Sequence, residues 1–206
     1  MKKIQALALA WALLIALCAC GPKPPAQAPE AGSGDQTDYA GLPAPGTDPA
    51  KQAPEDFIRP ALDVFSWFAV APLEADMAQV KQAPLETGGE PVDWFRVKDT
   101  RLDTYQKLSA YVRNFFDEEI TGQLMSNGVY RDIDGYLYNT QGGRGTNITI
   151  EGEHFDIIDM NEDTVRFEVA VSYTADSGEP ENPKILEFVM KKQNGKWVFT
   201  EFPFYL

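Results

Sequence analysis

Cysteine and histidine are scarce in this chain. Its 206 residues include only two cysteines, Cys18 and Cys20, and one histidine, His154. Because both cysteines lie in the first 20 positions, a domain further along the chain has no disulfide available and must be stabilised by an ordinary hydrophobic core. Zinc sites and Ser-His-Asp triads depend on histidine or cysteine, and no nucleophile motif accompanies His154. We therefore predict that the protein is not an enzyme and uses no metal or other cofactor.

Positively charged side chains are also few. Lysine and arginine number 18 against 31 aspartate and glutamate residues, a formal net charge of −13. Affinity for nucleic acid comes largely from basic side chains that neutralise phosphates, so we expect no nucleic-acid partner. The acidic excess can instead steer the protein toward a basic partner, or simply keep it soluble.

The acidic residues match no known catalytic or metal-binding motif. Residues 132–135 and the acidic segment 156–163 lack the ligand spacing of an EF-hand calcium loop. Glu118 and Glu119, adjacent on a predicted helix, would point about 100° apart and could not flank one glycosidic bond. These carboxylates are expected to lie on solvated surfaces.

No apolar run is long enough to cross a membrane as a stable helix. The run Ile4–Leu17 follows Lys2 and Lys3 and leads to Cys20, which is the pattern of a bacterial lipoprotein signal peptide. We predict a signal peptide over residues 1–19 and lipid modification of Cys20, the alternative being a plain secretory signal with incidental cysteines. Cleavage would leave 16 basic and 31 acidic residues, a net charge of −15. The protein is then expected to be exported and lipid-anchored to the outer face of the bacterial cell membrane, facing the cell wall.

A low-complexity stretch follows the predicted lipid anchor. Residues 20–54 consist mainly of Pro, Ala, Gly, Gln, Thr and Asp, with Tyr39 and Leu42 as the only large apolar side chains. Such a composition buries too little apolar surface to offset the entropy of ordering, so a disordered tether is predicted. Residues 55–206 are predicted to form a single domain.

The hydrophobic period changes along the segment Tyr130–Gly145. Apolar residues recur at spacings of three and four before it, as in helices, and alternate after it, as in strands. Asp134-Gly135 predicts a type I′ hairpin turn. Four strands are predicted after the segment, over 147–160, 164–174, 184–193 and 196–202, with hairpin loops at 161–163 and 194–195. The prediction is an α+β fold in which N-terminal helices pack on a curved antiparallel sheet of about four to six strands, arranged as a meander.

The first part of the predicted domain has mainly helical spacing. One helix is expected from Glu55 to about Pro72, and a short helix over Met77 and Val80. The segment Val92–Val97 is too short to assign to strand or helix. A longer helix is predicted over residues 102–116, preceded by Asp99 and Thr100, which are good residues for the start of a helix. A shorter helix is predicted over residues 120–125.

Aromatic residues make up 12% of the chain. Most are expected in the core, but a helix layer on a curved sheet can also leave an aromatic-lined hollow for a ligand. Such a hollow would be lined by Tyr111, Phe115, Phe167 and Trp197. Arg144, which lies among glycines, could bind a carboxylate of a ligand or form a structural ion pair.

Residues 101–206 resemble the bacterial cell-wall DL-endopeptidase inhibitor family of the IseA type. The resemblance rests on a helix with Tyr105 and Tyr111, and on four short segments. These are Phe116-Asp-Glu-Glu-Ile-Thr, Tyr130-Arg-Asp-Ile-Asp-Gly-Tyr-Leu-Tyr, Gly143-Arg144-Gly145 and Gly195-Lys-Trp197-Val-Phe. The resemblance implies an exported, acidic, non-enzymatic protein that binds NlpC-type peptidoglycan hydrolases at their active cleft and so regulates autolysins.

The partner-binding residues are predicted on electrostatic grounds, because charge complementarity favours docking of exposed carboxylates to a basic hydrolase cleft. The candidates lie in predicted turns and loops, together with the arginine above: Asp132, Asp134, Arg144, Glu162, Asp163, Asp176, Glu179 and Glu181. The protein is expected to be a monomer that contacts the membrane only through the lipid anchor at Cys20.

A second hypothesis belongs to another functional class. A nuclear-transport-factor-like or cystatin-like domain also places helices on a curved sheet, and as a lipoprotein it would bind a small ligand in the aromatic hollow. A deep pocket at Tyr111, Phe115, Phe167 and Trp197 would favour this hypothesis, and a filled core would not. An enzyme on the same scaffold would need a buried carboxyl with a raised pKa beside that hollow.

Overall fold

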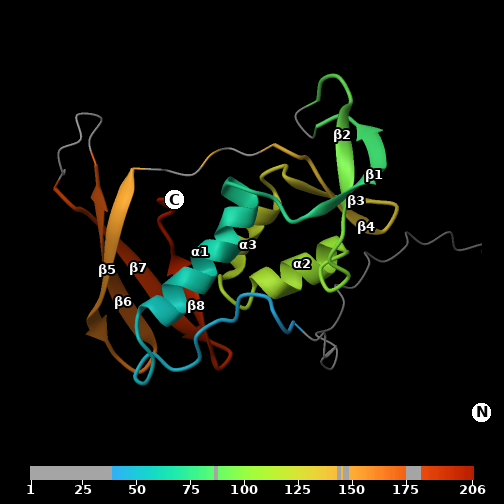
Figure 1. Ribbon diagram of the computed structural model, residues 1–206. Coiled ribbons are helices and arrows are strands. Elements are labelled where there is room, and N and C mark those ends of the chain that lie inside the picture. The colour runs from blue at the N-terminus through green and yellow to red at the C-terminus, as the bar shows by residue number, and fades with distance from the viewer. Residues whose placement is uncertain (1–38, 86–87, 143–144, 146–148, 175–181) are drawn as a thin grey trace, which may run out of the picture. The chain divides into compact units, whose positions relative to one another are not determined.

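The computed structural model describes residues 39–85, 88–142, 145, 149–174 and 182–206, all within one compact unit, Thr37–Leu206. Three helices and eight strands are assigned in this part of the chain (Figure 1). No described helix is long and apolar enough to cross a membrane. In chain order the elements are α1 (Glu55–Ala69), β1 (Ala75–Ala83), β2 (Val92–Val97), α2 (Tyr105–Val112), α3 (Glu118–Met125), β3 (Tyr130–Ile133), β4 (Tyr136–Asn139), β5 (Ile150–Met160), β6 (Thr164–Tyr173), β7 (Lys184–Gln193) and β8 (Lys196–Glu201).

The last four strands form an antiparallel sheet in the order β5-β6-β7-β8, which we call sheet B. The α+β fold class and the four-stranded meander predicted from the alternating pattern are therefore confirmed. Strand β6 alternates buried and half-buried side chains along its length, because one face of the sheet lies against the core. Asn194 and Gly195 both have positive φ, at 51° and 80°, as a two-residue hairpin turn between β7 and β8 requires.

A second antiparallel sheet, sheet A, has the strand order β1-β2-β4-β3. The Asp134-Gly135 turn joins β3 to β4 with φ values of 56° and 81°, which confirms the predicted hairpin. The predicted helix over Met77 and Val80 is wrong, because these residues belong to strand β1. Their spacing of three suggested a helix, but pairing with β2, from Ala83↔Val92 to Ala75↔Val97, holds the segment extended with a bulge between residues 76 and 80.

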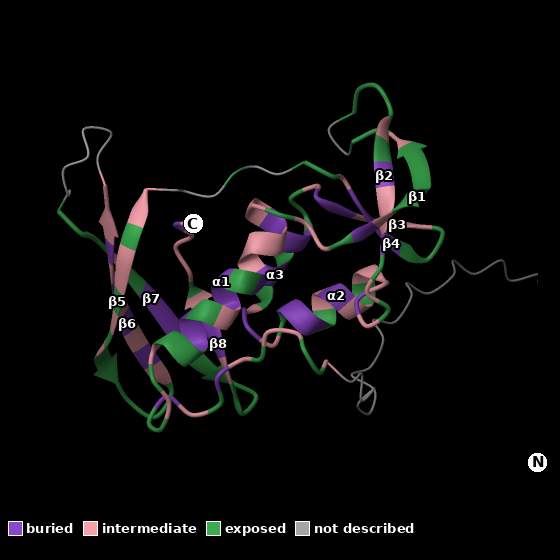
Figure 2. Ribbon diagram, viewed as in Figure 1, coloured by how far each residue is buried: buried purple, intermediate pink, exposed green. Residues whose placement is uncertain are grey.

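Helix α1 connects the two sheets through its two ends. Near its start, the Phe57 ring lies 6.0 Å from that of Phe167 in β6. Near its end, the Phe68 ring lies 5.1 Å from that of Tyr130 in β3, and the Tyr130 hydroxyl donates to the Trp67 carbonyl at 3.1 Å. One continuous hydrophobic core therefore includes residues of α1, sheet A and sheet B, as the buried faces in Figure 2 show.

Phe199 of β8 lies at the centre of the aromatic part of this core. Its side chain is 1% exposed, and its ring lies within 6.3 Å of four other phenylalanine rings, those of Phe116, Phe167, Phe188 and Phe202. Its backbone N–H donates to the Phe115 carbonyl at 2.8 Å, and its carbonyl accepts from the Asp117 N–H at 3.0 Å. Phe199 therefore joins the segment between α2 and α3 to sheet B.

Helix α2 is shorter than the predicted helix over 102–116, whereas α3 begins two residues before the predicted helix over 120–125, and each helix begins at its own cap. Thr104 accepts a hydrogen bond from the Lys107 N–H at 3.2 Å, and Asp117 accepts one from the Ile120 N–H at 2.9 Å. These are N-cap bonds, which satisfy backbone donors of the first turn. Asp99 was expected at the start of helix α2. It lies five residues before the Thr104 cap and instead accepts hydrogen bonds from the Arg101 guanidinium.

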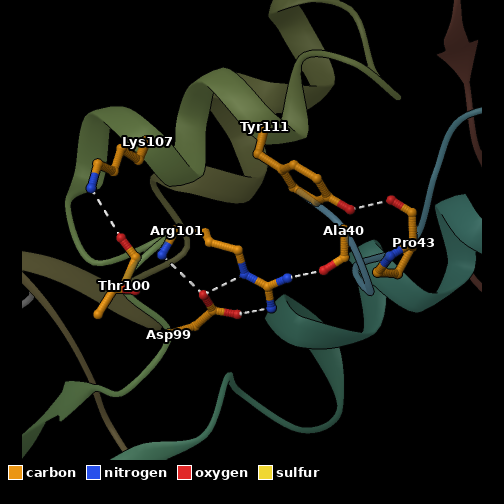
Figure 3. Close-up of polar contacts among 7 residues, drawn as sticks. All are labelled: Ala40, Pro43, Asp99, Thr100, Arg101, Lys107 and Tyr111. Carbon is orange, nitrogen blue, oxygen red and sulfur yellow. Dashed lines mark hydrogen bonds and ion pairs between the residues drawn. The ribbon is translucent and has the colours of Figure 1, made fainter. Parts of the chain in front are cut away.

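Residues 39–54 pack against the domain, so the folded part of the chain begins earlier than the predicted start at Glu55. We call residues 39–54 the strap. The Tyr39 ring lies 4.8 Å from that of Tyr111, and the Tyr111 hydroxyl donates to the Pro43 carbonyl (Figure 3). Arg101 donates to the Ala40 carbonyl while its guanidinium binds Asp99 through two further N–H groups, at 2.8 and 2.5 Å. These contacts offset the ordering entropy that the composition alone suggested could not be recovered.

Tyr111→Phe tests the attachment of the strap to α2. We expect the substitution to lower the free energy of unfolding by about 1 kcal/mol, because the Pro43 carbonyl loses a hydrogen bond within a partly buried contact. The measurement is urea denaturation of the full chain. Tyr173→Phe is the control, since the Tyr173 hydroxyl has no hydrogen-bond partner among the described residues, and it should leave the midpoint unchanged. Equal midpoints for the two variants would contradict the attachment.

Candidate binding surfaces

One groove lies between the ends of two hairpins of sheet B and the strap. It has a volume of about 590 Å³ and is open to solvent. We call it the hairpin groove. Its lining comes from the strap, the β5–β6 hairpin and the β7–β8 hairpin: Thr47, Asp48, Pro49, Ala50, Met160, Asn161, Glu162, Lys192, Gly195 and Trp197. The predicted partner-binding residue Glu162 is therefore part of a groove, which it shares with an aromatic ring.

The hairpin groove combines apolar and charged groups. Met160 is 46% exposed, and the half-buried ring of Trp197 lies 5.9 Å from the Lys192 ammonium group. Asp48 is 2.7 Å from Lys51, and the hydrogen bond from this lysine lowers the pKa of the Asp48 carboxyl, which is therefore ionised near neutral pH. Tryptophan is enriched among the residues that dominate binding energy at protein interfaces. The groove therefore has the composition of a docking surface for another protein.

Asp48 was missed by the sequence prediction because it lies within the supposed tether. The side chain of Gln52 accepts hydrogen bonds from the N–H groups of Thr47 and Asp48, at 2.7 and 2.9 Å. Asp48 itself accepts from the Ala50 N–H at 3.1 Å. The Thr-Asp-Pro sequence followed by a glutamine is a turn signal that could have indicated order here.

A second groove, of about 560 Å³, lies beside α1 and is partly lined by the strap residues Gly41, Leu42 and Pro43. Among its other lining residues is Asp63, and burial raises the pKa of the Asp63 carboxyl above its ordinary value. Nearby, Lys98 pairs with Glu74 at 2.5 Å. Asp63 is an exposed residue, so it lacks the buried environment that a catalytic carboxyl on this scaffold would need.

The predicted acidic residues do not form one site. Asp132 lies near the end of β3 and accepts from the Gly135 N–H at 3.0 Å, and Asp134 lies in the exposed β3–β4 turn, 3.4 Å from Lys81. Glu162 and Asp163 lie in the β5–β6 turn of sheet B. No described contact joins the two turns.

The remaining predicted residues are Cys20, Arg144, Asp176, Glu179 and Glu181. All five lie outside the described residues. Their expected roles in lipid anchoring and partner binding stay predictions.

The four residues expected to line an aromatic hollow do not do so together. Tyr111, Phe115 and Phe167 are at most 2% exposed and belong to the hydrophobic core, where the Tyr111 and Phe115 rings lie 5.5 Å apart. Burial also raises the pKa of the Tyr111 hydroxyl well above its ordinary value. Trp197 instead lines the hairpin groove. Close packing of aromatic rings fills the place where the hollow was expected.

His154, the single histidine of the chain, is an exposed residue of β5, and its Nε2 lies 3.0 Å from an Asp156 carboxylate oxygen. In the described ranges, no group of three or more histidine, cysteine, aspartate or glutamate side chains is placed to hold a metal ion.

No family model matches this chain, and no curated protein is significantly similar to it.

Proposed function

We propose that the protein is a membrane-anchored, extracytoplasmic binding protein that inhibits or modulates a peptidoglycan DL-endopeptidase of the NlpC type. The observation that carries the proposal is the hairpin groove, whose lining includes Glu162, Asp48 and the half-buried Trp197. A protein inhibitor needs a few buried anchors within a wider polar surface. The groove offers such an anchor and two carboxylates for a basic partner.

The filled core supports a role in protein binding over the alternative of a small ligand held in an aromatic hollow. Tyr111, Phe115 and Phe167 contribute to stability rather than to a pocket. The electrostatic part of the proposal follows from the net charge of −13, which favours encounter with a basic cleft and weakens with salt.

The test is inhibition of purified NlpC-type endopeptidases from the same organism by the full chain in detergent, over a range of salt concentrations. Stoichiometric inhibition that weakens as salt increases supports the proposal. Absence of inhibition, together with no capture of a wall hydrolase by the immobilised chain, would contradict the proposal.

Two substitutions locate the inhibitory surface in the hairpin groove. Trp197→Ala is expected to raise the inhibition constant by about thirtyfold, since loss of a buried aromatic anchor costs about 2 kcal/mol of binding energy. Glu162→Gln is expected to raise it by about threefold and to reduce its salt dependence, as loss of one exposed charge does.

Matched control substitutions lie outside the groove. Glu151→Gln removes an exposed charge from β5, and Ile185→Ala removes a side chain of β7 that is 54% exposed. Both should leave the inhibition constant unchanged. Thermal melts separate a loss of binding from a loss of folding for Trp197→Ala, because this residue also contacts the core. If the groove variants inhibit as well as the controls do, the inhibitory surface lies elsewhere.

A further inference from the structure

A row of three side chains crosses one face of sheet A. The strand register pairs Arg96 of β2 with Tyr138 of β4, and Tyr138 with Arg131 of β3. Directly paired residues in an antiparallel sheet point to the same face. The two arginines therefore flank Tyr138 on one face, with their Cα atoms about 10 Å apart, since neighbouring strands are about 4.8 Å apart.

This row lies on the face of sheet A opposite the main core. Val97, Tyr130 and Leu137, which point the other way in the same strands, belong to the hydrophobic core that joins the two sheets. Tyr138 is 5% exposed, although it is not part of that core. The side chains of the row and its neighbours therefore cover one another on the outer face.

Both arginines are held in position by an aromatic ring and a hydrogen bond. The Arg96 guanidinium lies 3.6 Å from the ring centroid of Tyr136, and its Nη1 donates to the Gln79 side chain at 3.0 Å. The Arg131 guanidinium lies 5.7 Å from the ring of Trp94, and its Nη1 donates to the Pro84 carbonyl at 2.7 Å. A guanidinium fixed in this way loses little side-chain entropy when it binds a carboxylate.

These two arginines differ from the other described arginines in their partners. Arg59, Arg101, Arg113 and Arg166 each form an ion pair with an aspartate or glutamate. Arg96 and Arg131 have no carboxylate within ion-pair distance among the described residues. In a chain with a net charge of −13, two cations without such a partner on one face are unusual.

Two carboxylates beside the row form no ion pair with its arginines. Asp76 lies opposite Arg96 in the register, but its oxygens accept from the Ala78 N–H and the Gln79 amide, both at 3.0 Å. The Gln79 side chain thus bridges Asp76 and Arg96, and these hydrogen bonds, to which the Arg96 charge adds, lower the pKa of the Asp76 carboxyl. At the edge of the face, Asp134 lies 3.4 Å from Lys81.

We propose that this face, which we call the arginine face (Lys81, Trp94, Arg96, Arg131, Tyr136 and Tyr138), binds an acidic segment of a partner protein. The planar guanidinium groups of Arg96 and Arg131 match carboxylates, which they can bind through paired N–H groups. The proposal is independent of the hairpin groove, which lies in sheet B and the strap and carries its own carboxylates.

The surroundings of the arginine face favour a protein segment over a small anion or a long polyanion. Two exposed apolar side chains lie at this face: Tyr136 is 42% exposed, and Leu85, which follows the Pro84 carbonyl that binds Arg131, is 38% exposed. Strand β1 is exposed along most of its length at the edge of the sheet (Figure 2). Arginine, tyrosine and methionine are enriched at protein interfaces. A long polyanion would be repelled by the remaining acidic surface, whereas a short acidic segment contacts only the local cations.

The test is the binding of a fluorescent peptide of alternating glutamate and valine to the full chain at low salt, measured by anisotropy. The arginine-face variant carries Arg96→Gln and Arg131→Gln. The matched control carries Arg113→Gln and Arg166→Gln, which remove the same charge from ion pairs elsewhere. We expect the dissociation constant to rise by about a hundredfold for the arginine-face variant, since each charged hydrogen-bonding group contributes about tenfold, and by no more than about twofold for the control.

Binding measurements with other ligands identify the kind of molecule that the arginine face binds. The same peptide with glutamine in place of glutamate should not bind, and a sulfated polysaccharide and vesicles of anionic lipid should bind equally weakly to both variants. Stronger binding of the polysaccharide or the vesicles through Arg96 and Arg131 would overturn the assignment to a protein segment. Absence of peptide binding, or equal loss in both variants, would overturn the site itself.

A second measurement uses the unaltered chain, in case the double variant does not fold. Phenylglyoxal modifies accessible arginines, and mass spectrometry reports each site. The glutamate peptide is expected to protect Arg96 and Arg131 and not Arg113 or Arg166. Uniform protection, or none, contradicts the proposal.

Discussion

Phe199→Ala is expected to lower the free energy of unfolding by about 3–5 kcal/mol, which is a large part of the stability of a single domain. The Phe199 ring is 1% exposed and contacts rings from the segment after α2, from β6 and β7, and from the chain after β8. Alanine would leave a cavity that these close-packed rings cannot fill. The measurement is urea denaturation of the full chain, monitored by far-ultraviolet circular dichroism.

The effect of Phe199→Ala should be distinguishable from that of losing any apolar side chain. Phe199→Leu keeps most of the volume and is expected to cost about 1.5 kcal/mol or less. Ile185→Ala, at a side chain that is 54% exposed, should change stability by less than about 0.5 kcal/mol. A cost for Phe199→Ala as small as that for Ile185→Ala would contradict the central position of Phe199 in the core.

Gly46→Ala is expected to destabilise the protein by about 1–3 kcal/mol. A Cβ atom at this position would lie inside van der Waals contact with the Phe57 ring, 2.7 Å from Cγ and nearer to Cδ1 and Cε1. Phe57 is 1% exposed and packs against Phe167, so its ring has little room to move. The substitution overpacks the contact between the strap and α1, and the measurement is the same denaturation.

Gly122→Ala provides the matched control with the opposite sign. Gly122 lies within α3, and a Cβ atom there would meet no described atom within 4 Å. Alanine in a helix is favoured over glycine by about 0.5–1 kcal/mol, so this variant should be more stable than the parent chain. If residues 39–54 were a disordered tether, Gly46→Ala would be neutral, and that result would exclude the packed strap.

The sheet B half of the fold was predictable because its signals are local. Alternating apolar residues in β6 and the Asn194-Gly195 turn with positive φ specify strands and a hairpin without reference to the rest of the chain, as the Asp134-Gly135 turn does in sheet A. The predicted strand 184–193 coincides with β7, and the predicted strands 164–174 and 196–202 end one residue later than β6 and β8.

The errors occur where a segment depends on a distant partner. Strand β1 has little alternation and mostly exposed side chains, and only its pairing with β2 makes it a strand. The strap has the composition of a disordered linker, yet its carbonyls at Ala40 and Pro43 accept hydrogen bonds from Arg101 and Tyr111, more than 60 residues away. No local pattern predicts such a contact.

The sequence by itself determined the α+β class, the meander of sheet B, the two hairpin turns and the acidic character of the protein, because each of these depends on composition or on residues close together in the chain. Only the tertiary structure decided that Glu162, Asp48 and Trp197 share one groove and that Arg96 and Arg131 lie on either side of Tyr138. The physical reason is that binding surfaces are assembled from separate segments, whose proximity follows from strand register and core packing.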